Sequence, residues 1–251
     1  MKIVACYSSK GGVGKTATAV NLAWWCAARG RTTLLADLDP QGASSFYFRV
    51  SPAKKNWGKV LRGRQAELGD QIRASEYPNL DVLPAHQGFR NVDVLLAAAE
   101  QSHKRLKQSL GTLESHYDLV ILDCPPTMGP LAEAIFNAAD RILLPLIPTT
   151  LAERSLEQLL EFFAQQGWKT KAIRPFFNMV QGRKTLHRST MARLRARIPH
   201  VAQAWVPHAR DVEYMGEQQA PLLATTPQSP AAKAFDAVFA EHCAKLVQTL
   251  A

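Results

Sequence analysis

Short apolar segments alternate with longer amphipathic segments along this chain. The short apolar runs predict strands over Lys2–Ser8, Thr32–Asp37, Leu80–Pro84, Asp118–Asp123, Arg141–Pro145, Ala172–Met179 and Ala204–Pro207. The helical patterns between them cover Lys15–Arg29, Val92–Leu110, Leu131–Ala138, Leu151–Gln165, Leu186–Ile198 and Ala231–Leu250. Strands that alternate with helices build βα units around a parallel sheet. The pattern therefore predicts an α/β fold, with a mostly parallel, twisted sheet flanked by helices.

Two stretches depart from this alternation. Ala43–Tyr77 is less periodic and predicts short helices and loops, whereas Pro221–Pro230 predicts an ordered connection before the last helix. Neither stretch has the composition of a domain linker, and no internal repeat interrupts the chain. We therefore expect residues 1–251 to form a single domain.

Composition narrows the class of protein. Hydrophobic residues make up 47% of the 251 residues, which favours a large core over disorder. None of the four cysteines lies in a CxxC pair, so we expect them to be small buried residues of a protein in a reducing compartment. No apolar run approaches the ~20 residues of a membrane-spanning helix, and Met1 leads directly into a strand without a signal peptide. We expect a cytoplasmic protein that does not bind membranes.

The net charge of +9 comes from one region. Residues 162–209 hold nine Lys and Arg residues and no Asp or Glu, a distribution typical of a face that binds a polyanion. A merely solvated helix would usually carry both signs of charge. Such a face binds DNA through its phosphates, without reading sequence. The candidate DNA-binding residues are Arg183, Lys184, Arg188, Arg193, Arg195 and Arg197, of which Arg193 and Arg197 share a helix face.

The stretch Ser9–Thr16 reads SKGGVGKT and lies between the first predicted strand and the first predicted helix. Strand, glycine-rich loop and helix in this order form a phosphate-binding loop. The glycines allow backbone N–H groups to converge on an anion, and the helix N-terminus adds its positive dipole. Lys15 would reach the β- and γ-phosphates, and the Thr16 hydroxyl would ligate Mg²⁺.

This loop differs from the ordinary Walker A pattern at its first positions. Ser9 stands where that pattern has glycine, and Lys10 adds a second lysine. A solvated surface lysine is the simpler interpretation of Lys10. The alternative is that Lys10 contacts a nucleotide across a dimer interface.

Two more predicted strands end in acidic residues. The segment from Asp37 through Asp39 ends the second strand, and Asp123 ends a later one. Ligands of open α/β sheets bind at the carboxyl ends of the strands, so these acids should meet the loop. Asp123 fits a Walker B acid, and either Asp37 or Asp39 could position an attacking water.

Together, three segments resemble the deviant Walker A, A′ and Walker B motifs of the ParA/MinD ATPases: Lys10–Thr16, Asp37–Gly42 and Asp123–Pro126. The resemblance runs along nearly the whole chain, and the Asp-Pro-Gln-Gly sequence at 39–42 points to the ParA branch. No winged-helix region precedes the loop, as in the short ParA type. The resemblance implies a P-loop fold and an ATPase that uses ATP and Mg²⁺.

The resemblance also implies roles for individual residues. It assigns catalysis to Lys10, which reaches across an ATP-sandwich dimer, to Lys15 within its own subunit, and to Asp39, which helps activate water. The metal residues would be Thr16, Asp37 and Asp123. The ATP-binding residues would be Lys10, Gly11, Gly12, Val13, Gly14, Lys15, Thr16, Ala17, Asn178 and Pro207.

The chain departs from the family pattern near the adenine-binding positions. Gln181 replaces an acid that often follows the late strand, and His208–Asp211 replaces the usual Arg-Asn-Val-Arg. Asn178 and Pro207 are the best matches for the adenine contacts, although Asn178 could equally be a turn residue.

The sequence favours one function over three alternatives. We expect an ATPase that dimerises on ATP, coats nucleoid DNA and positions a cargo such as a plasmid, chromosome or protein organelle. A ParB-like activator or cargo adaptor would stimulate its slow hydrolysis. A membrane-bound MinD-like protein would need a basic terminal helix, whereas Phe235–Ala251 has only Lys245. The cysteine spacing does not suit an iron–sulfur relative, and the scattered tyrosines do not suit a tyrosine kinase relative.

Overall fold

The computed structural model describes residues 1–53, 68–97 and 102–248, and its centre is one eight-stranded sheet. The strand order is β3-β4-β2-β5-β1-β6-β7-β8, and every pairing is parallel except that of the edge strand β3. The strands are β1 (Lys2–Cys6), β2 (Thr33–Asp37), β3 (Arg73–Ala74), β4 (Leu80–Leu83), β5 (Leu119–Asp123), β6 (Arg141–Leu146), β7 (Ile173–Val180) and β8 (Trp205–Pro207). The predicted α/β class with a mostly parallel sheet is confirmed.

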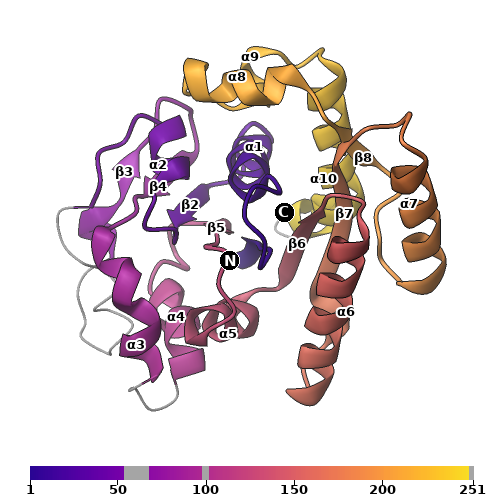
Figure 1. Ribbon diagram of the computed structural model, residues 1–251. Coiled ribbons are helices and arrows are strands. Elements are labelled where there is room, and N and C mark those ends of the chain that lie inside the picture. The colour runs from indigo at the N-terminus through magenta and orange to yellow at the C-terminus, as the bar shows by residue number, and fades with distance from the viewer. Residues whose placement is uncertain (54–67, 98–101, 249–251) are drawn as a thin grey trace.

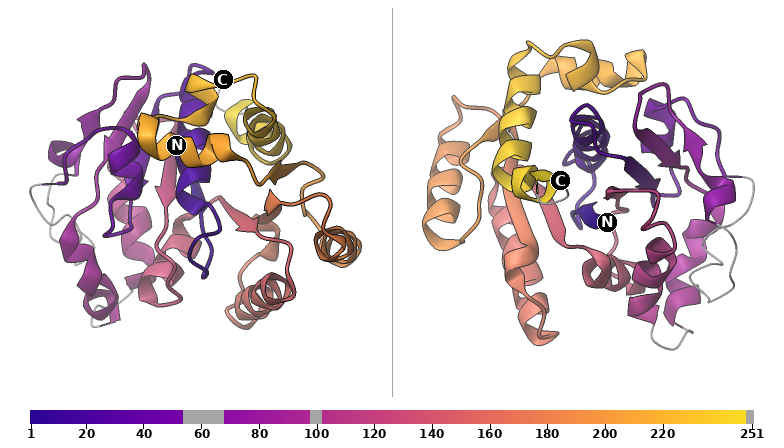
Figure 2. Two further views of the ribbon diagram at one scale, coloured as in Figure 1. Left: turned by 45° about the horizontal axis from the view of Figure 1, so that its top comes forward. Right: turned by 180° about the vertical axis from the view of Figure 1, so that it is seen from behind.

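Helices cover both faces of the sheet, as Figures 1 and 2 show. One face packs against α3 (Val92–Ala97), α4 (Ser102–Gly111), α5 (Pro130–Ala138), α6 (Thr150–Gln165) and α7 (Thr185–Arg197). The other face packs against α1 (Lys15–Ala27), α8 (Arg210–Gln218), α9 (Leu222–Thr225) and α10 (Pro230–Gln248). Ile3 and Ala5 of β1 point to the first face, and Val4 and Cys6 to the second. A strand buried on both sides explains why β1 reads as a continuous apolar run.

All seven predicted strands are present, with ends shifted by two residues at most. Within the predicted helix Val92–Leu110, the structure describes α3 and α4 on either side of positions 98–101, which lie outside the described residues. The short helix α2 (Ala43–Tyr47) confirms part of the expectation for Ala43–Tyr77, and positions 54–67 lie outside the described residues.

Sequence reasoning missed the strand β3 and the helix α8. The strand β3 has only two residues, too few to show an alternating pattern. The helix α8 is nine residues long and buries only Met215, so few apolar residues mark it in the sequence.

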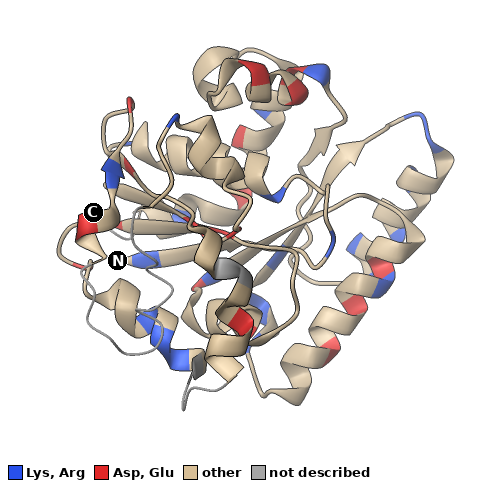
Figure 3. Cartoon of the chain, turned by 60° about the vertical axis from the view of Figure 1, so that its left-hand side comes forward, with Lys and Arg blue, Asp and Glu red and all other residues tan. Residues whose placement is uncertain are grey.

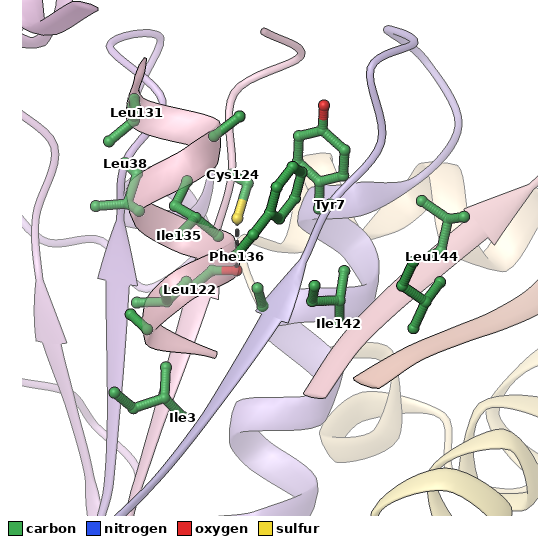
Figure 4. Packing of buried hydrophobic residues seen from close by; sticks show 14 of the residues in the cluster. Ile3, Tyr7, Leu38, Leu122, Cys124, Leu131, Ile135, Phe136, Ile142 and Leu144 are labelled. Atoms are coloured by element: carbon green, nitrogen blue, oxygen red, sulfur yellow. Dashed lines mark hydrogen bonds between the residues drawn. The ribbon is translucent and has the colours of Figure 1, made fainter. Parts of the chain in front are cut away.

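The core beneath the site packs aromatic and sulfur-containing side chains closely. Figure 4 shows Tyr7, Phe136 and Cys124 side by side above the sheet. The rings of Tyr7 and Phe136 meet edge to face, with centroids 4.7 Å apart. Cys124 is fully buried, and burial raises the pKa of its thiol well above the usual value. All four cysteines are buried and free, as predicted, and Cys124 packs within this core.

Among the described helices, none combines the length and the apolar character needed to span a bilayer.

Candidate active site

The glycine-rich loop joins the end of β1 to the start of α1 at Lys15. Gly12 and Gly14 have φ angles of 70° and 90°, in the left-handed region that glycine adopts without strain. A Cβ on Gly14 would lie 2.2 Å from Nδ2 of Asn178. Position 14 therefore requires glycine for two reasons: its φ angle is left-handed, and Asn178 of β7 leaves no room for a Cβ atom.

Asn178, in strand β7, contacts the loop through its side chain. Its Nδ2 donates a 2.8 Å hydrogen bond to the Val13 carbonyl, and the residue is 3% exposed. The sequence placed Asn178 on adenine, but the structure places its amide against the loop. Pro207 ends β8 beside Val180 of β7. The adenine contacts of Asn178 and Pro207 stay predictions.

The two lysines of the loop have different surroundings. Lys15 is buried, and its Nζ donates a 3.0 Å hydrogen bond to the Lys10 carbonyl. Burial lowers the pKa of Lys15, while Asp123 and Asp39 act in the opposite direction. Lys10 is more exposed, and it makes no ion pair with any residue that the structure describes. The Lys10 ammonium therefore has no counter-charge from the residues that the structure describes.

The acids converge on the loop as the strand order requires. β5 lies between β1 and β2, and Asp37 stands opposite Asp123 in the parallel register. Asp37 accepts hydrogen bonds from the Ser45 N–H at 2.9 Å, the Ser45 hydroxyl at 2.6 Å and the Asp39 N–H at 3.2 Å. Asp37 therefore anchors α2 through Ser45, a contact that sequence reasoning missed. The signal for it was a polar Ser-Ser pair directly after the acidic segment.

Asp123 is the least satisfied group of the site. It is fully buried, and neither carboxylate oxygen has a hydrogen-bond partner in the described structure. Burial first, and then the charge of Asp37, raise its pKa to about 8; the nearby Thr16 and Ser44 hydroxyls act in the opposite direction. The Ser44 hydroxyl is itself without a hydrogen-bond partner in the described structure. A buried carboxyl of this kind ionises readily only beside a cation, and together with the Thr16 hydroxyl it offers oxygen ligands that fit a divalent metal ion.

The remaining acid, Asp39, is half-exposed, and its Oδ1 accepts the Gln41 N–H at 2.9 Å. No group of three or more His, Cys, Asp or Glu side chains in the described ranges has metal-binding geometry. The Asp123 carboxylate and the Thr16 hydroxyl suit Mg²⁺, which keeps several waters and takes further ligands from phosphates.

The basic segment separates into paired and exposed residues. Arg193 and Arg197 of α7 both reach Glu153 of α6, at 2.7 and 2.9 Å, and Arg197 also pairs with Glu157 at 2.7 Å. The predicted common face of the two arginines is confirmed. Figure 3 shows acidic and basic positions meeting where α6 and α7 run side by side.

The other candidate cations of this segment differ in the same way. Arg195 donates to the carbonyls of Ala202 and Gln203, at 3.1 and 2.6 Å. In contrast, Arg183, Lys184 and Arg188 are exposed at the start of α7 and make no ion pair with a described residue. Of the six candidate DNA-binding residues, these three are the most accessible.

Comparisons with known proteins agree with this site. Residues 1–173, more than half of the chain, match a family described as an AAA domain, to which the chain belongs. The sporulation initiation inhibitor protein Soj of Bacillus subtilis is 35% identical over 160 residues, which are 63% of this chain and 63% of Soj. The chromosome partitioning protein ParA of Caulobacter vibrioides is 34% identical over 164 residues, 64% of this chain and 61% of that protein. The match thus spans less than two thirds of these relatives.

The fold is shared over a longer stretch. A putative plasmid partition protein from Borrelia burgdorferi, bound to AMPPNP, superposes with a TM-score of 0.84 at 21% identity. The superposition covers 97% of this chain and 99% of that one, which shows a common fold. The family match, the partition relatives and the loop that begins at Lys10 together show that this chain belongs to the ParA/MinD family of P-loop ATPases.

Proposed function

We propose that residues 1–251 act as one ATP-dependent switch that binds Mg²⁺–ATP at the carboxyl ends of β1, β2 and β5. The observation that carries the proposal is the fully buried Asp123, whose two carboxylate oxygens have no hydrogen-bond partner in the described structure and whose charge acts on the buried Lys15. Thr16 and Asp123, with Asp37 behind them, would hold the metal, and the loop N–H groups and Lys15 would hold the phosphates. Bound Mg²⁺ would supply neutralisation of the negative charge on the phosphates.

Hydrolysis of ATP follows from the same arrangement. Asp39 lies at the half-exposed edge of the site, where it can orient a water molecule toward the γ-phosphate. Lys10 has no ion pair in the described part of its own subunit, and we assign it to the phosphates of a second copy of the chain. ATP binding would thereby hold two copies together. A ParB-like activator or a cargo adaptor would accelerate a slow basal hydrolysis.

The ATP-bound dimer would bind DNA without sequence specificity. The support is the acid-free segment 162–209, in which Arg183, Lys184 and Arg188 remain exposed. Dimerisation doubles the number of phosphates contacted, so nucleotide state would control DNA affinity. Such a switch in the cytoplasm would associate with the nucleoid and position a plasmid, a chromosome or a protein organelle such as a carboxysome.

DNA retention measured with ATP, with ADP and at raised salt tests the switch. We expect tight retention with ATP, weak retention with ADP, and a steep loss of binding as salt rises. Equal retention in ATP and ADP, or none in ATP, would contradict the proposal.

No observation favours the MinD-like alternative. Phe235, Val238 and Phe239 of α10 are fully buried in the core, so the apolar face of this helix already packs against the protein. The apolar residues of α10 that the structure describes are therefore not offered to a membrane.

A further inference from the structure

A second cavity, of about 730 Å³, lies at the opposite end of the sheet from the phosphate-binding loop. It opens beside the amino ends of β6 and β7, at the C-terminal ends of α5 and α6. Its size falls in the range of ~300–1,000 Å³ that is usual for small-ligand sites. Five cationic side chains line it: Lys107, Arg141, Lys169, Lys171 and Arg174.

The single acid among the lining residues does not neutralise these cations. Asp140 already accepts the Ile3 N–H through Oδ2 at 2.9 Å, and its Oδ1 lies 3.6 Å from Nζ of Lys2. In the described ranges, none of the five lining cations forms an ion pair. The cavity therefore concentrates positive charge, with five cations and one acid among the lining residues.

Two of the cations are held in place by the sheet. Arg141 begins β6, and Arg174 lies in β7, with the side chains on the same face of neighbouring strands. The Arg174 guanidinium donates to the carbonyls of Lys171 and Ile173, which fixes its position. Burial, and secondarily the charge of Arg141, lower the pKa of Arg174. The two guanidinium groups repel each other, and an anion between them would relieve this repulsion.

The rim and wall of the cavity complete the site. Lys169 and Lys171 are exposed at the turn before β7, where flexible ammonium groups can reach a ligand. Trp168 forms one wall, packed edge to face against Phe163 at 5.4 Å and Phe136 at 6.1 Å. A rigid aromatic wall beside fixed arginines is a pre-organised surface.

We infer that this cavity binds an anion that carries two or more phosphate groups. Guanidinium and ammonium groups together recognise phosphate through charge-assisted hydrogen bonds. A single phosphate would leave most of the five cations unpaired. The phosphates belong either to a free polyphosphate or nucleotide, or to neighbouring positions of a DNA backbone.

Calorimetric titration with sodium tripolyphosphate in Mg²⁺-free buffer tests the cavity directly. We expect two sites on the wild type, because the phosphate-binding loop takes one tripolyphosphate and the cavity another. The double variant Lys169→Gln/Lys171→Gln should lose about tenfold or more in affinity at one site only. Lys15→Gln should remove the other site. Arg154→Gln/Lys233→Gln removes the same charge from exposed positions outside the cavity and should keep both sites.

Retention of non-specific duplex DNA by the same variants identifies the source of the phosphates. Weaker DNA binding by Lys169→Gln/Lys171→Gln than by the control pair assigns the cavity to the DNA backbone, even without a second tripolyphosphate site. A second tripolyphosphate site with unchanged DNA binding assigns it to a free ligand. The inference is overturned if Lys15→Gln abolishes all tripolyphosphate binding and the two double variants retain DNA equally. Arg141→Gln, from the cavity floor, should reproduce the result of the lysine pair.

Discussion

Two glycines of the phosphate-binding loop differ in how well they would tolerate a larger side chain. Gly14 has a φ of 90°, and an added Cβ would lie 2.2 Å from Asn178. Gly11 lacks a left-handed φ, and nothing lies within 4 Å of its Cβ position. The same chemical change therefore has different costs at two positions of one loop.

We expect Gly14→Ala to lower the free energy of unfolding by about 2 kcal/mol, because it combines backbone strain with a clash. It should also weaken binding of a fluorescent ATP analogue, since Asn178 would be pushed off the Val13 carbonyl. Urea unfolding and nucleotide titration measure the two effects. Gly11→Ala is the matched control and should keep the wild-type unfolding midpoint; equal losses in both variants would show that the contact with Asn178 is unimportant.

His242 makes a pH-dependent contribution to the free energy of unfolding. It is buried, its Nε2 lies 3.3 Å from the Pro175 carbonyl, and burial lowers its pKa to about 4. Glu241 on its own helix raises this pKa, while Arg174 and Arg141 of the facing strands lower it. The folded protein thus keeps His242 neutral, whereas the unfolded chain binds a proton near pH 6.5.

Stability should therefore be full above about pH 6.5 and should fall, by about 2–3 kcal/mol, as the pH drops toward 4. Urea unfolding between pH 7.5 and 4.5 measures this slope. His242→Gln should flatten it, and His116→Gln, at an exposed position, should not. An unchanged slope in His242→Gln would assign the acid sensitivity to other groups.

At the scale of elements, α6 and α7 are joined by the carboxylate of Glu153, which pairs with Arg193 and Arg197. Two of the cations predicted to bind DNA are therefore occupied within the subunit. Both arginines keep about half of their side-chain surface exposed, so the ion pairs can exchange with phosphates.

Glu153→Gln should lower stability by about 1 kcal/mol, because these pairs are only partly shielded from solvent. It should at the same time raise DNA affinity, since both arginines lose an internal competitor. Thermal unfolding and DNA retention measure the two changes. Glu161→Gln, on an exposed position of the same helix, should change neither; reduced DNA binding by Glu153→Gln would mean that the ion pairs hold α7 in its binding geometry.

At the scale of the whole molecule, Lys10 connects the nucleotide site to the oligomeric state that we propose. Lys10→Ala should remain monomeric with ATP, because the phosphates of the second copy lose their cross-subunit partner. Asp39→Ala should keep binding ATP and should accumulate the dimer. Light scattering with and without ATP measures both, and Lys233→Ala serves as the exposed control. A Lys10→Ala protein that dimerises normally would show that Lys10 acts only within its own subunit.

Much of this molecule could be predicted from local sequence signals. The strands were found because β1, β5 and their neighbours are buried on both faces and read as apolar runs. The convergence of Lys15 and Asp123 followed from parallel strands ending at one edge of the sheet. The two-residue β3 was missed, because local periodicity cannot show where packing pairs a short edge strand.

The sequence by itself determined which groups meet at the site. These are a glycine-rich loop with two lysines and the acids at the ends of neighbouring strands. Its motifs are local, and the parallel sheet brings them together without further information. Only the tertiary structure decided how polar groups are shared. It turned Asn178 toward Val13 and bound Arg193 and Arg197 to Glu153. Among the described residues, it left the carboxylate of Asp123 without a hydrogen-bond partner and the five cations of the second cavity without an ion pair. The physical reason is that a side chain's charge is a property of its residue, but its neutralisation depends on contacts between elements distant in sequence.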